Sequence, residues 1–262
     1  MTQAVRLPLR LLLPASLVMS LLLGFPSLVL LFKALTPSFI DSLVSPVVTE
    51  ALRLSLMTTA LSLLIILVTG TPAAYLLARY RFPGHRLLDS LLDLPLVLPP
   101  TVAGVALLLT FGRRGVIGAP LSEAGINIAF TTTAVVLAQV FVAAPLFIRA
   151  MKAGFSSVPE RVEAAALTLG ADRWRTFWRV TLPLTLPSVI EGSVLAWARA
   201  LGEFGATIVF AGSFIGRTQT MPLAIYAALE SDLNTAIAIS AILTLTAFTL
   251  LFVFRYFVNR DD

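Results

Sequence analysis

The chain has 262 residues, of which 58% are hydrophobic and only 13% are charged. Soluble globular domains are about 45–50% apolar and about 25% charged, so this composition excludes an ordinary soluble domain and predicts an all-α polytopic membrane protein. Because the chain has no cysteine, disulfides and thiolate metal sites are excluded. The net charge of +5 is distributed over alternate loops, as membrane orientation requires, so we expect no nucleic-acid partner.

Six segments are apolar over roughly the 20 residues that a helix needs to cross the hydrocarbon core. They are residues 11–35, 51–78, 91–111, 131–150, 186–210 and 236–257. The first is long for the apolar part of a signal peptide, and no small-residue cleavage site follows it, so we expect it to be retained. With a cytoplasmic N-terminus, 13 Lys and Arg residues fall inside and 4 in outer loops. This asymmetry predicts six spans with both termini in the cytoplasm.

Prolines interrupt several of these segments, most densely at Pro95 and Pro99-Pro100. Proline removes a backbone donor, and the freed carbonyls are tolerated in lipid only where neighbours or water satisfy them. Helix packing is one interpretation of such a break. For Pro99, Pro100 and Thr101 we favour a second, in which the broken helix lines the path of a permeating ion.

Residues 156–183 form a polar segment between two apolar runs, on the cytoplasmic side of the predicted topology. Ser157 and Glu160 have the spacing of a capping box, which predicts a helix start. An apolar stripe follows at the i, i+3, i+4 and i+7 spacing of one helix face. Its members are Val162, Ala165, Ala166 and Leu169. Gly170 suits the end of this helix, because glycine adopts the left-handed conformation without steric cost.

A second short helix is predicted after Gly170, with Asp172 as its cap. One face of it carries Trp174, Phe177, Trp178 and Thr181. Three arginines, Arg173, Arg175 and Arg179, are typical of a helix that lies at a headgroup surface. The unit is either an ordinary amphipathic connection resting on the membrane or a knob held by another protein.

Two stretches resemble a known family. Ala165-Ala166, Gly170, nine further residues, Val180 and Leu182-Pro183 are similar to the EAA motif in the membrane subunits of ABC importers. The run from Ala198 to Thr207, ARALGEFGAT, resembles the molybdate, tungstate and sulfate permease branch. The resemblance covers roughly residues 50–257. One departure is that the motif's usual glutamate position falls on Ala164, while Glu163 lies one residue earlier.

This resemblance implies a binding-protein-dependent permease subunit in the cell membrane. Residues 1–50 would hold the N-terminal tail, first span and outer loop, residues 51–257 the ABC type-1 transmembrane domain, and residues 258–262 a cytoplasmic tail. The implied partners are an ABC ATPase subunit, an extracytoplasmic oxyanion-binding protein, a second copy of the chain and the lipid bilayer. The coupling helix that docks on the ATPase would present Glu163, Ala165, Ala166, Leu167, Thr168, Gly170 and Ala171.

No G-x-x-x-x-G-K-[ST] phosphate loop occurs in the sequence. We therefore expect a transport subunit without catalytic residues or a cofactor of its own, with ATP and magnesium on the partner subunit. His85 is the single histidine, so no metal site is expected. Arg113-Arg114, on the outer side, is either a solvated loop or a basic site that attracts an oxyanion or the binding protein that delivers it.

Arg199 and Glu203 stand four residues apart in the fifth predicted span, so they lie on one side of a helix. They are either a structural ion pair or, as intramembrane charges often are, part of a water-filled path. In the second interpretation, Gly205 leaves room and Thr207 offers a hydroxyl at a two-fold dimer interface. The substrate implied is a tetrahedral oxyanion, molybdate or tungstate, with sulfate or thiosulfate as the alternative.

A rival from another class is an ion-coupled secondary transporter, which needs no ATPase. It predicts several ionisable residues within spans as coupling sites. We identify only Arg53, Arg199 and Glu203 as candidates.

Overall fold

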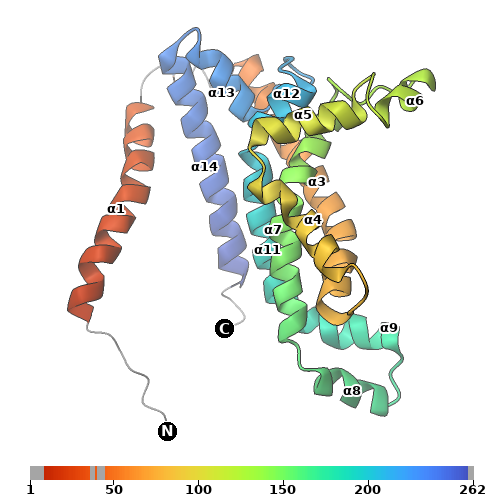
Figure 1. Cartoon of the computed structure of the whole chain (residues 1–262). Coiled ribbons are helices and arrows are strands. Elements are labelled where there is room, and N and C mark those ends of the chain that lie inside the picture. The colour runs from red at the N-terminus through yellow and green to blue at the C-terminus, as the bar shows by residue number, and fades with distance from the viewer. Residues whose placement is uncertain (1–8, 36–38, 40–44, 259–262) are drawn as a thin grey trace.

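A computed structural model of the chain describes residues 9–35, 39 and 45–258, and Figure 1 shows its helices. The predicted tail at residues 258–262 lies outside this part except for its first residue. The described residues form helices and connecting turns without a strand, which confirms the predicted all-α class. The elements are α1 (Leu9–Lys33), α3 (Pro46–Arg79), α4 (His85–Val97), α5 (Pro100–Phe111), α6 (Gly118–Glu123), α7 (Thr132–Ser157), α8 (Glu160–Thr168), α9 (Arg173–Thr176), the π-helical turn η1 (Phe177–Thr181), α10 (Leu182–Leu184), α11 (Leu186–Leu201), α12 (Gly205–Ala211), α13 (Met221–Leu229) and α14 (Leu233–Val258).

Four helices, α1, α3, α7 and α14, are long and apolar enough to cross a membrane without interruption. Two more spans arise if bent helix pairs are each counted as one. α4 and α5 meet at 118°, and the segment Arg173–Leu184 meets α11 at 66°. Counted in this way the described helices give up to six spans, as predicted, but the second pair covers residues 173–201 and is shifted relative to the predicted span at residues 186–210.

The span predicted at residues 91–111 is divided into two helices, and the break expected at Pro99-Pro100 is confirmed. α4 ends at Val97, α5 begins at Pro100, and Figure 1 shows α5 lying across the end of the bundle. The cause is the Pro-Pro pair, since a residue before proline is driven out of the helical region. Leu98 and Pro99 accordingly have extended ψ angles of 133° and 138°.

The expectation of one helix over residues 186–210, by contrast, is wrong. α11 ends at Leu201 and α12 begins only at Gly205. α12 is held against α5 at two glycines. A Cβ on Gly205 would lie 2.6 Å from the Cβ of Pro100, and one on Gly104 would lie 2.7 Å from the Cβ of Val209. The two broken spans thus pack closely where each is interrupted.

The core of the molecule is the bundle of α3, α7 and α11. Phe147 of α7 is fully buried, and it lies between Gly70 of α3 and Gly192 of α11. The same helices are joined by buried hydroxyl and amide groups. Ser62 donates to the Gln139 Oε1 (2.9 Å), and the Gln139 Nε2 donates to Thr58 (3.2 Å). Small residues and interhelical hydrogen bonds are the usual means of joining helices in lipid, where apolar burial gives no net attraction.

α1 stands apart from this bundle, and among the described helices it packs mainly against α14, as Figure 1 shows. Most of its apolar side chains are exposed, including Leu23 (69%) and Phe32 (74%). An exposed apolar helix of this length is stable in lipid or against another protein, not in water.

Candidate coupling site and translocation pathway

The predicted helix–glycine–helix unit is present and begins at Val158. The capping-box prediction for its start is wrong, because Ser157 belongs to the last turn of α7 and donates to the Gly154 carbonyl (2.7 Å). Glu160 is the first residue of α8 and Pro159 precedes it as the cap. The helix therefore starts on a proline with fixed φ and not on a hydroxyl cap.

The predicted end of this helix is confirmed. Gly170 has φ +88°, its N–H bonds to the Leu167 carbonyl, and the Ala171 N–H bonds to the Ala166 carbonyl. These two bonds are those of a Schellman motif, which requires a left-handed residue at the glycine position. The cap of the next helix is confirmed as well, because the Asp172 carboxylate accepts a hydrogen bond from the Arg175 N–H (2.7 Å).

The surface of α8 is almost entirely exposed in this chain, and none of its residues is buried. Val162 (36% exposed) and Leu167 (45%) are open, and Leu169, just past the end of the helix, is 89% exposed. Of the predicted coupling residues, Ala165, Leu167, Thr168 and Gly170 are exposed, whereas Glu163, Ala166 and Ala171 are half-buried. The helix thus presents small and apolar side chains that no other part of the described chain covers.

Glu163 points in the opposite direction, toward its own chain. Its Oε1 accepts a hydrogen bond from the Arg79 Nη2 (2.9 Å) and one from the Thr181 hydroxyl (2.7 Å). The Arg79 Nη2 also donates to the Val158 carbonyl (3.1 Å). The side chains of Arg79 and Glu163 are only 12% and 19% exposed, so the pair is largely shielded from water. We call this set of contacts among Arg79, Val158, Glu163 and Thr181 the latch.

The latch connects three elements that are distant in sequence: the end of α3, the helix α8 and the turn η1. Sequence reasoning missed Arg79, because nothing in the local pattern distinguishes it from the other basic residues at a cytoplasmic boundary.

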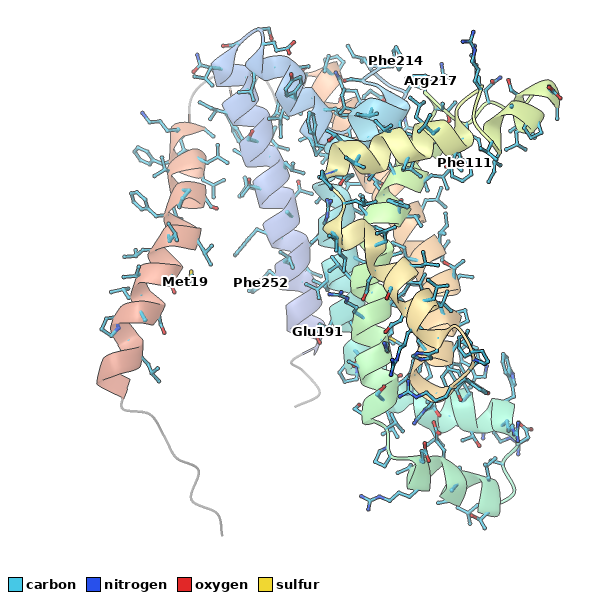
Figure 2. The ribbon with its side chains drawn as sticks, viewed as in Figure 1. Met19, Phe111, Glu191, Phe214, Arg217 and Phe252 are labelled. Atoms are coloured by element: carbon cyan, nitrogen blue, oxygen red, sulfur yellow. The ribbon has the colours of Figure 1, made fainter. Side chains whose placement is uncertain are left out.

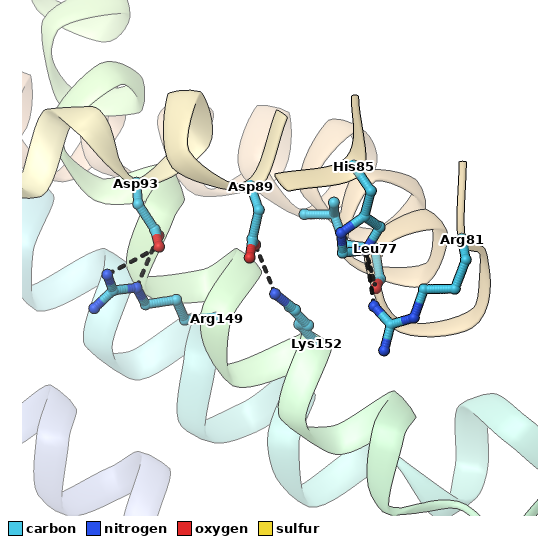
Figure 3. A network of polar contacts seen from close by, with 7 residues as sticks. All are labelled: Leu77, Arg81, His85, Asp89, Asp93, Arg149 and Lys152. Carbon is cyan, nitrogen blue, oxygen red and sulfur yellow. Dashed lines mark hydrogen bonds and ion pairs between the residues drawn. The ribbon is translucent and has the colours of Figure 1, made fainter. Parts of the chain in front are cut away.

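A row of two ion pairs joins α4 to α7, as Figure 3 shows. The Arg149 guanidinium makes two hydrogen bonds to the Asp93 carboxylate (2.7 and 2.9 Å), and the Lys152 ammonium contacts Asp89 (2.6 Å). The His85 Nε2 continues the row, lying 3.0 Å from the Leu77 carbonyl oxygen. The two ion pairs hold α4 against α7.

The predicted pair Arg199–Glu203 is confirmed, with 2.7 Å between the Arg199 Nη1 and the Glu203 Oε2. Glu203 is buried (1% exposed), and its second oxygen accepts a hydrogen bond from the Ala206 N–H (2.7 Å). The Glu203 carboxylate therefore links the two helices, because it contacts Arg199 of α11 and Ala206 of α12. The Arg199 side chain is 33% exposed, so it is the member of the pair that reaches the surface.

The other predicted pathway residues divide into two groups. Pro99, Pro100 and Thr101 are exposed at the start of α5, next to the buried Gly205. Thr207 is fully buried, and its hydroxyl has no hydrogen-bond partner among the described residues. A buried hydroxyl without a partner is unusual and marks a place where water or a rearrangement supplies one.

Sequence reasoning missed two acidic residues within the predicted spans. Glu191 is exposed on α11, where Figure 2 labels it, and Asp93 lies on α4. The statement that spans contain only Arg53, Arg199 and Glu203 as ionisable groups is therefore wrong. Arg53 itself is exposed near the start of α3 and pairs with Glu50 at 3.7 Å. Among the described residues, no group of three or more His, Asp or Glu side chains is placed to hold a metal ion.

Figure 2 labels Phe111, Phe214 and Arg217 at the opposite end of the molecule from α8. Phe214 is 51% exposed, and the Arg217 carbonyl accepts a hydrogen bond from the Thr132 hydroxyl (2.9 Å). Thr131 is the residue that precedes α7, and its hydroxyl donates to the Ile128 carbonyl and does not cap the helix.

The structure thus combines broken membrane helices with an exposed helical unit at one end. Similarity to known proteins identifies the class of transport protein to which this arrangement belongs. Residues 70–261 match the family described as binding-protein-dependent transport system inner membrane component, so the chain belongs to that family. It is a multi-pass membrane subunit of the ABC importer type.

Among its relatives is the molybdenum transport system permease protein ModB of Mycobacterium tuberculosis. The two are 48% identical over 211 residues, which cover 80% of each chain. The sulfate transport system permease protein CysW of Synechococcus elongatus is 43% identical over 185 residues, 71% of this chain and 65% of the relative.

The fold is also similar to a solved structure, that of a bacterial alginate ABC transporter in complex with an alginate pentasaccharide-bound periplasmic protein. The TM-score is 0.74 at 17% identity, with 96% of this chain and 94% of the other covered. At this identity the likeness concerns the ABC type-1 transmembrane fold alone.

Proposed function

We propose that the chain is the membrane permease of an ATP-driven importer for molybdate or tungstate. The observation that carries the proposal is the 48% identity to a molybdenum permease over 80% of both chains. Two copies of the chain would form the pore, an extracytoplasmic binding protein would deliver the oxyanion, and two ATPase subunits would bind ATP and magnesium on the cytoplasmic side. Both termini are cytoplasmic in this arrangement.

The exposed surface of α8 supports docking on an ATPase subunit. Most of its uncovered residues are small or apolar. Its first turn also exposes Glu160 and Arg161, whereas the Glu163 carboxylate is paired with Arg79. The ATPase cleft that receives α8 would therefore be lined mainly by apolar groups. Closing of the ATPase subunits on ATP would displace α8, and the latch would carry that displacement to α3.

The pair Arg199–Glu203 supports an oxyanion pathway along the exposed side of α11. A bare carboxylate would repel a dianion, whereas Glu203 is neutralised by Arg199 and hydrogen-bonded to the Ala206 N–H. Arg199, with a third of its side chain exposed, and the open start of α5 at Pro99 and Thr101 are the groups we assign to the pathway.

Sulfate is the second candidate substrate, because a sulfate permease is 43% identical to the chain. Uptake into proteoliposomes separates the possibilities. With the chain, its ATPase subunit and its binding protein present, we expect ATP-dependent accumulation of molybdate and tungstate, with sulfate excluded. Accumulation of sulfate alone would overturn the assignment of molybdate or tungstate as substrate. Uptake by the isolated chain without ATP would favour a secondary transporter.

The coupling role of α8 has its own control within the chain. Gly170 and Gly125 have nearly equal left-handed φ angles, +88° and +82°, and a Cβ at either meets no atom within 4 Å. A bulky side chain therefore causes similar backbone strain at both. We expect Gly170→Leu to abolish ATP-dependent uptake with the chain still inserted, and Gly125→Leu to retain it. If the two variants show equal uptake, the proposed role of α8 in coupling is refuted.

A further inference from the structure

The short helix after Gly170 carries an exposed surface that the coupling role does not use. It consists of Arg173, Trp174, Arg175, Trp178 and Arg179, which we call the arginine–tryptophan surface. All five side chains are exposed, with Trp174 at 71% and Trp178 at 50%. Large exposed indoles are rare on soluble surfaces and are enriched where a protein meets the headgroup region of a membrane.

The position of this surface relative to the spans follows from its aromatic contacts. Trp174 and Trp178 pack on Phe177, with ring centroids 6.3 and 5.4 Å away. Phe177 in turn packs edge-on against Tyr75 of α3 at 5.3 Å. Tyr75 lies about one helical turn before the end of α3, so the indoles are level with the last turn of a membrane span. Figure 1 shows the same placement, with α9 across the ends of α3 and α7 and α8 beyond it.

The opposite side of the segment is fixed to the protein. Thr176 and Thr181 are buried, and Thr181 donates to the latch. One side of the segment is therefore held by the bundle, and the other is free to contact what surrounds the protein at this level.

The charges of the free side are not balanced by the chain. Within the described residues, none of Arg173, Arg175 and Arg179 takes part in an ion pair. The neighbouring Asp172 is engaged as the helix cap. Three unpaired guanidinium groups beside two exposed indoles, at the level of the membrane boundary, are complementary to anionic headgroups with their acyl chains.

We propose that the arginine–tryptophan surface binds anionic phospholipid. The arginines contact the phosphates and the indoles lie at the boundary between headgroups and acyl chains. Assignment to the cytoplasmic leaflet rests on the orientation in the proposed function, whereas the lipid contact itself does not. Thr181 belongs to this segment and also donates to Glu163 of α8 in the latch. Bound lipid therefore also stabilises the part of the chain to which the latch attaches α8.

Tryptophan fluorescence tests this directly, because the chain has three tryptophans and the third, Trp197, is buried in the bundle. The full chain is placed in nanodiscs of phosphatidylcholine with about one fifth phosphatidylglycerol. In one preparation the phosphatidylglycerol is brominated. In the other, the phosphatidylglycerol is unmodified and an equal mole fraction of brominated phosphatidylcholine is used. Total charge is the same in both, so a difference in quenching reports enrichment of anionic lipid next to the indoles.

We expect quenching by brominated phosphatidylglycerol to be at least about three-fold stronger, and the excess to decline in high salt as the arginines are screened. R173Q/R175Q/R179Q should abolish the excess, while R113Q/R114Q, on the outer loop, should retain it. W174F/W178F, which leaves only Trp197, should show no excess. Equal quenching by the two lipids in the wild type, or an excess that survives R173Q/R175Q/R179Q, would overturn the proposal. Neither ATP nor oxyanion is present, so the result is independent of transport.

Discussion

Replacing Glu163 with alanine removes the central acceptor of the latch. The Glu163 Oε1 accepts from Arg79 at 2.9 Å and from Thr181 at 2.7 Å, and both bonds are lost together. Hydrogen bonds to a charged group contribute about 1.5–3 kcal/mol each. Because the two side chains of the ion pair are 12% and 19% exposed, some screening by water remains, and we take the lower value for each bond. The expected loss is therefore about 3 kcal/mol in the stability of α8 on the bundle.

Hydrogen exchange of the α8 amides measures this loss locally. A change of about 1.4 kcal/mol is tenfold in an equilibrium constant, so Glu163→Ala should speed exchange within α8 by up to roughly 100-fold. Thr181→Val removes only one of the two donors and should speed it by about tenfold. Exchange in α3 and α7 near Phe147 should remain unchanged in both variants, because the core does not depend on the latch.

Glu160 provides the matched control. It lies in the same first turn of α8 as Glu163, but it is exposed and makes no ion pair among the described residues. Both substitutions to alanine remove an acidic group near the helix N-terminus, which costs less than about 1 kcal/mol at an exposed position. If Glu160→Ala accelerates exchange as much as Glu163→Ala, or if neither does, the latch does not hold α8 and the reasoning fails.

Three further substitutions test the packing of the broken spans and the caps. Gly205→Ala places a Cβ 2.6 Å from that of Pro100 and should lower stability by about 1–3 kcal/mol in a thermal melt, whereas Gly24→Ala, with no atom within 4 Å, should be neutral. Gln139→Leu removes two hydrogen bonds between α3 and α7 and should cost about 1–3 kcal/mol by the same measurement, and an unchanged melting temperature would contradict the hydrogen-bonded core. The pKa of Asp232 is lowered from 3.8 by the hydroxyl of the threonine three residues on and by two backbone N–H groups, so its stabilisation of the start of α14 should be complete above that ordinary value and disappear as the pH falls through the lowered pKa, as carboxyl titration by NMR would report.

Local signals in the sequence predicted local structure well. Gly170 and Asp172 were expected to end one helix and begin the next, and both do so with the expected backbone geometry. Such features depend on a few neighbouring residues, so one sequence suffices to identify them. The pair Arg199–Glu203 was predictable for the same reason, since a spacing of four residues on one helix decides the contact.

The sequence indicated that one span is interrupted, but not how strongly it bends. Pro99 and Pro100 indicated a break, but its size, 118°, comes from the packing of α5 on α12. That packing brings Pro100 against Gly205, residues more than a hundred positions apart. A hydropathy pattern does not reveal such a contact, because the residues on both sides of the break remain apolar.

The latch shows a different limit of sequence reasoning. The one-residue offset of the glutamate, at 163 and not 164, was visible in the sequence, but its consequence was not. Adjacent residues on a helix differ in direction by about 100°, so the offset decides whether the carboxylate faces the partner or the chain itself. In the structure Glu163 faces Arg79, and Ala164 is exposed in the place where the motif usually carries an acid.

The offset also determines how a force on α8 would reach the membrane helices. Through the chain itself, α8 leads by way of α9, η1 and α10 to α11, with a bend of 66° on the way. Through the latch, it leads directly to the end of α3. The first connection is covalent and survives any substitution, whereas the second depends on one carboxylate. Glu163→Ala should therefore leave a transporter in which docking of the ATPase still moves α11 but no longer moves α3 with it. ATP hydrolysis would then continue with reduced transport per ATP, whereas a purely structural role for Glu163 predicts that both decline in parallel.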